Sequence, residues 1–344
     1  MNYKILEQQR RVLSESFKNS TIMISGSTGL IGAAVVKYLL DLNDRYDASI
    51  NTIALYRNIE KKEFLYKDFS NRDDLTFCYV SDEAAPVLEN DIDYFIHAAG
   101  ISGGTKMHLK DPEKIFTVGI NGTKNMLDVA VSHNCKGFLF VSTYEIYGAI
   151  NSEELITEEQ PCILDPLLLR NSYAEVKRTC ESMMAAYNAK YGLNVYSARI
   201  SSTFGSEVNY NDPRFFAEFG RCIVEERDIV LKSRGGTVRN YLDADDAAAA
   251  FLYILSKGSS NNAYNVTNMD NALSIKEIAE TFIKISNGKS RLLFEIDDDI
   301  DKLGFRKEGK TLLNSNKVIN IGWKPVYSIE DTIEKLINAM KKGL

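Results

Sequence analysis

Short apolar runs alternate with amphipathic stretches along the first two hundred residues of the chain. Six of these runs have the character of buried strands, and they cover residues 21–25, 50–56, 75–80, 93–99, 137–143 and 194–200. Apolar positions at helical spacing lie between some of the runs, at residues 30–43, 120–134 and 172–190. This strand–helix alternation predicts a parallel sheet covered by helices on both faces.

The pattern changes after residue 200, where loops lengthen, short helices dominate and arginines gather in NDPRFF, KSRGGTVRNYLD and KLGFRKEGK. We therefore expect three parts: a helical extension at residues 1–20, a sheet domain at 21–200 and a smaller region at 201–344. The smaller region is predicted to cap a substrate and to be interleaved with the last elements of the sheet. Because no internal repeat or low-complexity linker separates the two larger parts, they are expected to share an interface.

Composition narrows the class of protein. The 344 residues suffice for a full core, and 44% hydrophobic with 26% charged residues is ordinary for a globular chain. The net charge of −6, with basic and acidic residues mixed, argues against a nucleic-acid partner. No apolar run approaches the roughly 20 residues of a membrane span, and three histidines without ligand spacing predict no metal site. Five scattered cysteines without a CxxC motif are typical of reduced thiols, so a cytoplasmic protein is expected.

The segment ISGSTGLIGAAV places three glycines, spaced GxxGxxG, between the first predicted strand and its helix. Such glycines allow a tight turn, close approach of the backbone to a pyrophosphate and close packing of the helix on the strand. The helix N-terminus then directs its free N–H groups and positive dipole end at the phosphates. We interpret the segment as a dinucleotide site, so the predicted fold class is α/β, a Rossmann-type doubly wound parallel sheet with a smaller C-terminal substrate-binding region. The residues assigned to this turn are Gly26, Thr28, Gly29, Leu30, Ile31 and Gly32.

The adenosine end of the cofactor is expected to contact the ends of the second and third strands. An acid at the end of the second strand would bind the ribose hydroxyls and suit NAD. Tyr56 stands there instead, and the adjacent Arg57 either pairs with the 2′-phosphate of NADP or is an ordinary solvated arginine. The choice between NAD and NADP therefore stays open. Further cofactor contacts are assigned to Asp82, a candidate partner of the adenine amino group, and to Ala98, Ala99 and Gly100 of the motif HAAG.

Tyr173 and Lys177 lie four residues apart on one predicted helix and therefore share a face. Thirty residues earlier, Thr143 stands at the carboxyl end of a strand, where a doubly wound sheet binds its ligands. The ammonium is expected to lower the pKa of the phenol, so that Tyr173 takes a proton from a substrate hydroxyl while hydride leaves for the nicotinamide. Thr143 would hold that hydroxyl, and Lys177 would also contact the nicotinamide ribose. A second pair at this spacing, Tyr253 and Lys257, has no such strand end before it and is expected to serve packing.

Eight motifs support a resemblance over nearly the whole chain: GSTGLIG, HAAG, GTKN, STYEIYG, YAEVK, ARISSTFG, VRNYLDADDAAAAF and LNSNKVINIGWKP. Together they resemble the extended short-chain dehydrogenases that act on nucleotide sugars, which include 4-epimerases, 4,6-dehydratases and uronic acid decarboxylases. The resemblance implies oxidation of a nucleotide-diphosphate sugar at C4 and further chemistry on the 4-keto intermediate. It also implies a homodimer, in which residues 120–134 and 172–190 of each subunit would form a four-helix bundle.

Individual residues match the family's pattern. Thr143, Tyr173 and Lys177 match its catalytic triad. Glu145 matches a glutamate that serves in dehydratases and decarboxylases as a base at C5 or near the C6 group, and that simple epimerases generally lack. Arg239 matches an arginine that grips the nucleotide diphosphate, which suits a bidentate guanidinium. Weaker matches in segments that face the nucleotide are Arg214 and Arg306.

The chain also departs from the family's pattern. Tyr144 stands where glucose 4,6-dehydratases have a proton-donating aspartate and decarboxylases a serine, although a tyrosine could donate a proton. Gly119 replaces an asparagine before GT, and Ser202 replaces an asparagine near the diphosphate. Together with Tyr56 in place of the usual acid, these residues indicate a divergent member whose nucleotide base and sugar do not follow from the motifs.

The leading hypothesis is an NAD(P)-dependent nucleotide-sugar enzyme that works through a 4-keto intermediate, of dehydratase or decarboxylase type because of Glu145. A 4-epimerase is the first alternative, since it needs only the catalytic triad. A 4-keto sugar reductase that consumes NADPH is the second, and it is motivated by Arg57. A dinucleotide sensor without catalysis is the least favoured hypothesis because Tyr173 and Lys177 are both present.

Overall fold

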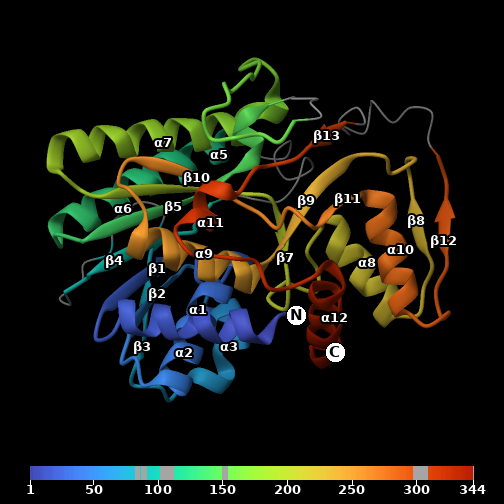
Figure 1. Ribbon diagram of the computed structural model, residues 1–344, viewed down its shortest axis with the longest axis horizontal. Coiled ribbons are helices and arrows are strands. Elements are labelled where there is room, and N and C mark those ends of the chain that lie inside the picture. The colour runs from blue at the N-terminus through green and yellow to red at the C-terminus, as the bar shows by residue number, and fades with distance from the viewer. Residues whose placement is uncertain (82–85, 87–90, 101–111, 149–153, 297–308, 344) are drawn as a thin grey trace.

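A seven-stranded parallel sheet forms the centre of the molecule (Figure 1). The computed structural model describes residues 1–81, 86, 91–100, 112–148, 154–296 and 309–343. The strands follow the order β10–β6–β5–β4–β1–β2–β3, so the chain reverses its direction of winding between β1 and β4. This confirms the predicted α/β fold, and the six predicted strands are present within two residues of their expected ends. The strands are β1 (Thr21–Ser25), β2 (Asn51–Tyr56), β3 (Leu75–Tyr79), β4 (Tyr94–His97), β5 (Gly137–Thr143), β6 (Val195–Ile200) and β10 (Asn262–Val266).

Helices cover both faces of this sheet. One face packs against α2 (Leu30–Tyr46) and α9 (Ala244–Lys257), and α1 (Tyr3–Ser16) lies on the outside of these two helices. The opposite face packs against α6 (Gly122–Ser132) and α7 (Ser172–Tyr191). Neighbouring strand residues face opposite sides, so Ile22 and Ile24 of β1 join the core under α2 and α9, whereas Met23 joins the core under α6 and α7. The shorter helices of this half are α3 (Ile59–Tyr66), α5 (Pro112–Phe116) and α11 (Asn316–Asn320).

The remaining elements form a second body beside the sheet, on the right of Figure 1. Its largest sheet has the order β11–β9–β13, with β7 paired to β9, and a separate pair joins β12 to β8. Its own core is formed by apolar side chains of three helices, including Phe216, Phe282 and Leu336. These elements are β7 (Ser202–Phe204), α8 (Phe215–Val224), β8 (Ile229–Leu231), β9 (Val238–Asp243), β11 (Ala272–Ser274), α10 (Ile275–Ile285), β12 (Leu292–Phe294), β13 (Lys310–Thr311) and α12 (Ile329–Lys342).

Two sequence features find a structural explanation in the helices. Gly119 lies in a π-helical turn that precedes α6, and a Cβ atom there would come within 2.3 Å of Val176 on α7. The close contact explains why this position carries a glycine. In the second tyrosine–lysine pair, Tyr253 is buried in α9 and the Lys257 ammonium lies 5.2 Å from the centre of its ring, at the C-terminal end of the helix. As predicted, this pair serves packing.

Candidate functional site

A cleft of about 1410 Å³ runs along the carboxyl edge of the central sheet and continues between the sheet and the second body. It is lined by the ends of β1, β2, β4, β5 and β6, by the start of α7 and by the segment that follows β7. All the candidate site residues that the structure describes line this one cleft. Asp82 and Arg306 lie outside the described residues. The residues brought together are Gly26, Thr28, Gly29, Leu30, Ile31, Gly32, Tyr56, Arg57, Ala98, Ala99, Gly100, Thr143, Tyr144, Glu145, Tyr173, Lys177, Ser202, Arg214 and Arg239.

The glycine-rich turn forms one end of the cleft. Gly26 has a φ of +70°, and a Cβ atom there would lie 2.7 Å from the backbone nitrogen of Ala99. A Cβ atom on Gly32 would lie 2.2 Å from the carbonyl oxygen of Gly26. Helix α2 then begins at Leu30, and its N-cap, Gly29, offers no side-chain hydrogen bond to the first turn. The bare backbone and the positive end of a 17-residue helix fit a pyrophosphate, so these residues would hold a dinucleotide.

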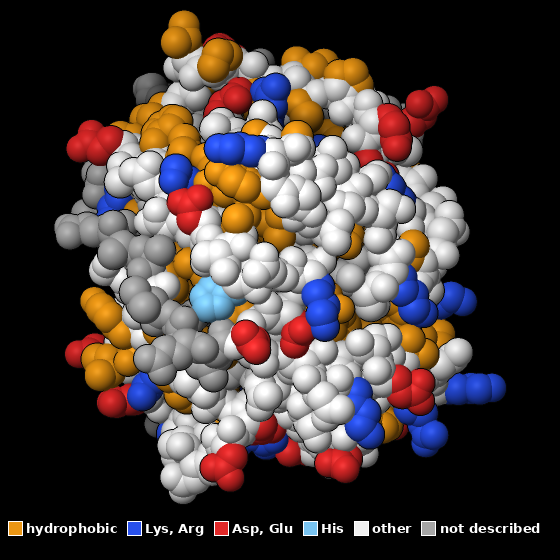
Figure 2. Space-filling model, turned by 90° about the vertical axis from the view of Figure 1, so that its left-hand side faces the viewer, with side chains coloured by type: hydrophobic (Ala, Val, Ile, Leu, Met, Phe, Trp, Pro, Cys, Tyr) orange, Lys and Arg blue, Asp and Glu red, His pale blue; other side chains and the backbone are white. Residues whose placement is uncertain are grey.

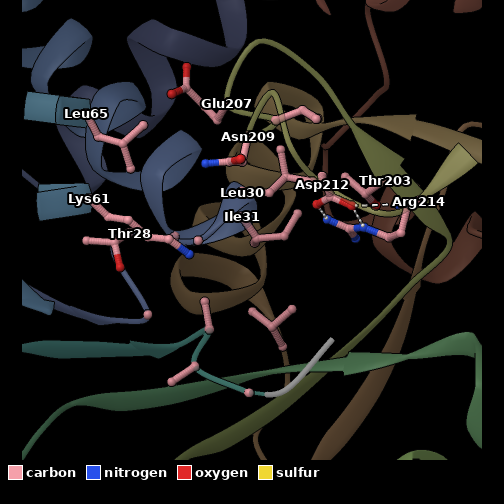
Figure 3. A pocket seen from close by; sticks show the side chains of 18 of the residues that line it. Thr28, Leu30, Ile31, Lys61, Leu65, Thr203, Glu207, Asn209, Asp212 and Arg214 are labelled. Carbon is pink, nitrogen blue, oxygen red and sulfur yellow. Dashed lines mark hydrogen bonds and ion pairs between the residues drawn. The ribbon is translucent and has the colours of Figure 1, made fainter. Parts of the chain in front are cut away.

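An aromatic cluster stands where an acid would bind the adenosine ribose. Tyr56 packs edge-on against Phe77 and Tyr79, and the Lys62 ammonium lies 5.7 Å from the centre of the Tyr56 ring. Arg57 is exposed at the rim of the cleft. Lys61 of α3 lines the cleft as well, and Figure 3 shows it on the same side of the cavity as Thr28. It is a second cation of the cleft besides Arg57, and it was not predicted from the sequence.

The three predicted catalytic residues meet at the ends of β5 and α7. The hydroxyl group of Thr143 lies beside the phenol of Tyr173 and acts to lower its pKa. Lys177 is buried, and its ammonium donates a hydrogen bond of 2.7 Å to the carbonyl oxygen of Val141. The same ammonium lies 4.3 Å from the centre of the Phe140 ring and 5.8 Å from the centre of the Tyr173 ring. The lysine therefore anchors α7 to β5 and does not hydrogen-bond the phenol directly.

The electrostatics of this trio differ from the sequence prediction. Burial lowers the pKa of Lys177 to about 8. Burial, followed by the negative charge of Glu145, raises the pKa of Tyr173 above its ordinary value. The prediction of a lowered phenol pKa is therefore wrong for the protein without ligands. The physical reason is that burial disfavours the charged phenolate, and the charge of Glu145 adds to this effect.

His97, the first residue of the motif HAAG, is a buried side chain that was not predicted to belong to the site. Thr123 donates its hydroxyl proton to the Gly119 carbonyl at 2.7 Å, so its oxygen accepts from His97 Nε2 at 3.1 Å. Nδ1 then accepts from the hydroxyl of Ser25 at 2.5 Å. Burial, and then the charge of Lys177, lower the pKa of His97 to about 3, so the ring is neutral and ties β4 to β1 and α6.

Glu145 and Tyr144 follow Thr143 directly, in a short helical turn of residues Tyr144–Tyr147. The Glu145 N–H donates to Thr143 Oγ1 at 3.3 Å, which holds the carboxylate-bearing residue against the strand end. Tyr144 is buried and hydrogen-bonds to Arg239, whose guanidinium carbon lies 5.9 Å from the centre of the tyrosine ring. The phenol of Tyr144, and the lesser charge of Glu145, raise the pKa of Arg239. The arginine of β9 thus reaches the end of β5.

Arg214 is brought to the cleft already paired. Its Nε and Nη2 atoms donate to the two carboxylate oxygens of Asp212 at 2.9 and 2.7 Å, as the dashed lines in Figure 3 show. Burial raises the pKa of Asp212, but the Arg214 guanidinium outweighs this and holds the pKa below its ordinary value. The sequence reasoning found the arginine but missed its partner two residues earlier. Ser202 lies in β7, the strand that pairs with β9.

Some features are absent from the described residues. No described helix is long and apolar enough to cross a membrane. Across the same residues, histidine, cysteine, aspartate and glutamate form no group of three or more that could hold a metal ion. All five cysteines are free. On the face shown in Figure 2, lysine and arginine side chains are interspersed with aspartate and glutamate side chains.

Comparison with known proteins agrees with the geometry of the cleft. The chain is 24% identical to the low-salt glycan biosynthesis protein Agl12 of Haloferax volcanii, over 92% of this chain and 97% of that protein. Its fold is similar to that of a dTDP-glucose 4,6-dehydratase from Bacillus anthracis in complex with NAD, with a TM-score of 0.77, 19% identity and coverage of 94% and 97% of the two chains. A UDP-glucose 4-epimerase from Thermotoga maritima with UDP-glucose is similar at a TM-score of 0.76 and 18% identity, over 94% and 99%. The family model for the NAD dependent epimerase/dehydratase family matches residues 22–267, and the chain therefore belongs to this family of enzymes.

Proposed function

We propose that the chain oxidises a nucleotide-diphosphate sugar at C4 with a bound NAD and then uses Glu145 in a second step, as dehydratases and decarboxylases do. The observation that carries this proposal is the position of Glu145, which lines the same cleft as Tyr173 and whose N–H donates to Thr143 Oγ1 at 3.3 Å. A carboxylate beside the predicted catalytic residues suits a base that acts on a carbon next to the one that is oxidised. Simple C4 oxidation and reduction would need only Thr143, Tyr173 and Lys177.

Each residue has a distinct part in the first step. The hydroxyl group of Thr143 holds the sugar hydroxyl beside Tyr173, which takes up its proton as a general base. Bound NAD would accept the hydride and place a positive ring near the phenol. Lys177 contributes a positive charge to the same site while its hydrogen bond to Val141 keeps α7 in place. Burial and the charge of Glu145 raise the pKa of the phenol, and the positive ring of bound NAD would act in the opposite direction.

Two arginines are assigned to the nucleotide diphosphate. Arg239 reaches the cleft from β9 and contacts Tyr144, and Arg214 follows from the loop before α8. A planar guanidinium suits phosphate oxygens because it donates two parallel hydrogen bonds. We accordingly assign residues 21–200 mainly to the dinucleotide and catalysis, and residues 201–344 mainly to the nucleotide sugar.

The test is the variant Glu145→Gln, which keeps the shape of the side chain and removes the charge. We expect C4 oxidation to proceed and the second step to stop, so that a 4-keto sugar or reduced cofactor accumulates. Mass spectrometry of the sugar and absorbance of the cofactor measure the two. Glu218→Gln, on the exposed surface of α8, is the matched control. Normal product at a normal rate from Glu145→Gln would make this residue structural and leave the 4-epimerase as the better assignment.

A second candidate follows from the rim of the cleft, where Arg57 and Lys61 stand and Tyr56 occupies the end of β2 in place of an acid. Two cations at this place suit the 2′-phosphate of NADP, which motivates a reductase of 4-keto sugars. Such an enzyme consumes NADPH in stoichiometric amounts, whereas the leading proposal recycles one bound dinucleotide. Measuring cofactor consumption per sugar converted separates the two.

We also propose a cytoplasmic homodimer in which α6 and α7 pack against the same helices of a second copy. The outer side of α7 carries small residues, including the exposed Ala186. Ala186→Arg would place a large charge in that interface, so the mass in solution should fall from a dimer to a monomer. An unchanged dimer mass would show that this surface is not the interface.

A further inference from the structure

We propose that Glu181 is a positioning residue that acts through Arg199 and Tyr147. Together these three side chains fix the turn that carries Glu145 relative to the helix that carries Tyr173. The inference depends on the proposed function only for what this turn does during turnover.

Glu181 stands on the working face of α7, although it does not line the cleft. Tyr173, Lys177 and Glu181 follow one another at intervals of four residues, so they lie along one side of the helix. Tyr173 and Lys177 reach the cleft, and Glu181 lies one turn deeper. This placement makes Glu181 a support for the other two and gives it no direct contact with a substrate in the described cleft.

The carboxylate of Glu181 is held by a two-pronged ion pair with Arg199 of β6. Arg199 Nε and Nη2 donate to the two carboxylate oxygens at 3.1 and 2.7 Å, and the hydroxyl of Ser197 donates to Oε1 at 2.6 Å. The two charged side chains are only 12% and 15% exposed. Burial raises the pKa of Glu181, but Arg199 and then Ser197 outweigh it and hold the pKa below its ordinary value. A buried pair with this geometry tolerates little movement, because breaking it would leave an unpaired charge.

The third nitrogen of Arg199 extends the pair to the turn after β5. Nη1 donates to the Tyr147 hydroxyl oxygen at 3.0 Å and to the Glu158 carbonyl oxygen at 3.1 Å. The Tyr147 hydroxyl in turn donates to Asn265 Oδ1 of β10 at 2.7 Å. Tyr147 is buried and stands two residues after Glu145 in the same helical turn. The hydroxyl of Tyr147 therefore ties this turn to β6 and β10.

A second connection closes the arrangement from the other side. Lys177 holds the carbonyl oxygen of Val141 on β5, and Arg199 lies in register with Ser142 of the same strand. Helix α7 is thus hydrogen-bonded directly to β5 through Lys177, and it is linked to the turn after β5 through the ion pair of Glu181 with Arg199. Lys177 and Glu181, four residues apart on α7, therefore set the position of the turn relative to the helix. The distance between the Glu145 carboxylate and Tyr173 follows from this arrangement.

The first test needs no substrate. Tyr147→Phe removes only the bridging hydroxyl group. Arg199→Lys keeps the positive charge but loses the pair of hydrogen bonds from Nε and Nη2 to Glu181. We expect amide hydrogen exchange of residues 143–148 to rise about two- to tenfold in both variants, the range for one lost hydrogen bond, with α7 unchanged. Arg72→Lys is the matched control, because Arg72 also forms a fork to a carboxylate, is 23% exposed and does not line the cleft. Unchanged exchange of residues 143–148 in both variants overturns the proposal.

The second test measures turnover of the nucleotide sugar by the same proteins. We expect kcat to fall about tenfold with KM unchanged, since the reacting groups are displaced while the nucleotide contacts stay. A raised KM with unchanged kcat contradicts a positioning role. If the unaltered chain converts no nucleotide sugar at all, the proposed function fails. The exchange experiment still decides in that case whether Arg199, the partner of Glu181, and Tyr147 hold the turn in place.

Discussion

The two ends of the cleft are built in different ways. At the cofactor end, the surface offered to a ligand is mainly backbone. Gly26 and Gly32 allow chain segments to approach closely, and the first turn of α2 presents N–H groups. At the sugar end, the charged side chains are already engaged with other side chains, as Arg214 is with Asp212 and Arg239 is with Tyr144. Under the proposed function, the cofactor end is thus ready for its ligand, whereas the sugar end would have to exchange partners when a ligand binds.

This difference explains what each end can recognise. A backbone cradle holds any pyrophosphate at the same place, because it offers main-chain N–H groups and no selective side chain. Paired side chains hold a particular ligand only if that ligand outcompetes the existing partner, so they discriminate between substrates. The predicted catalytic residues Thr143, Tyr173 and Lys177 lie between the two ends of the cleft, where the carboxyl end of β5 meets the start of α7.

The largest effect is expected from a substitution that removes the proposed general base and leaves both ends of the cleft unaltered. Tyr173→Phe removes the proposed general base, so kcat should fall about 10²–10⁴-fold. The dinucleotide content of the purified protein should stay the same because the glycine turn is untouched. Turnover and cofactor content are measured on one preparation. A variant that turns over at nearly the normal rate would remove Tyr173 from the mechanism.

A smaller effect is expected when the cofactor end is broken. Gly32→Ala adds a Cβ atom 2.2 Å from the Gly26 carbonyl oxygen. Forced overpacking of this kind costs about 1–3 kcal/mol, so we expect NAD affinity to fall about 5- to 150-fold, as titration calorimetry would show. Gly29→Ala is the control, because its Cβ atom would stand 3.3 Å from the same oxygen and needs only a small shift. Equal losses in the two variants would refute the cradle.

The pH dependence of turnover tests the group between the two ends. The ammonium form of Lys177 is present below its pKa of about 8 and is lost above it, because burial has lowered the pKa from the ordinary 10.5. A step that needs this charge should slow about tenfold for each pH unit above 8. The nearby groups that keep the ammonium charged are Cys180 and Glu181 on the same helix, and His97 of β4 stays neutral. A rate that stays constant to about pH 10 would show that the charge is not needed.

The smallest effect sharpens the comparison at the sugar end. Asp212→Asn releases Arg214 from its carboxylate, so a nucleotide diphosphate would no longer have to displace a charged partner. We expect KM to fall by up to about fivefold, since partly exposed ion pairs contribute about 0–1 kcal/mol. Steady-state kinetics with Asp212→Ala in parallel provide the check. A raised KM in both variants would mean that Asp212 orients Arg214 and does not compete for it.

The parts that could be predicted from the sequence are those that depend on local spacing. The apolar runs predicted six of the seven strands of the central sheet, all but β10, and the glycine spacing predicted the turn before α2. The parts that were missed depend on contacts between distant segments. Arg199 and Tyr147 are 52 residues apart in sequence, and no local pattern announces their hydrogen bond. The pKa of Tyr173 was predicted in the wrong direction, because i, i+4 spacing fixes the face of a helix but shows neither how deeply the phenol is buried nor that Glu145 lies near it.

The most direct measurement of the central claim uses the protein as purified. The protein is denatured to identify any released dinucleotide, and the intact protein is incubated with a panel of nucleotide hexoses and hexuronates, with the products weighed by mass spectrometry. The account predicts tightly held NAD and a product that is lighter than its substrate by water or carbon dioxide. An empty site that consumes NADPH only with 4-keto sugars would contradict it and place the chain among the reductases.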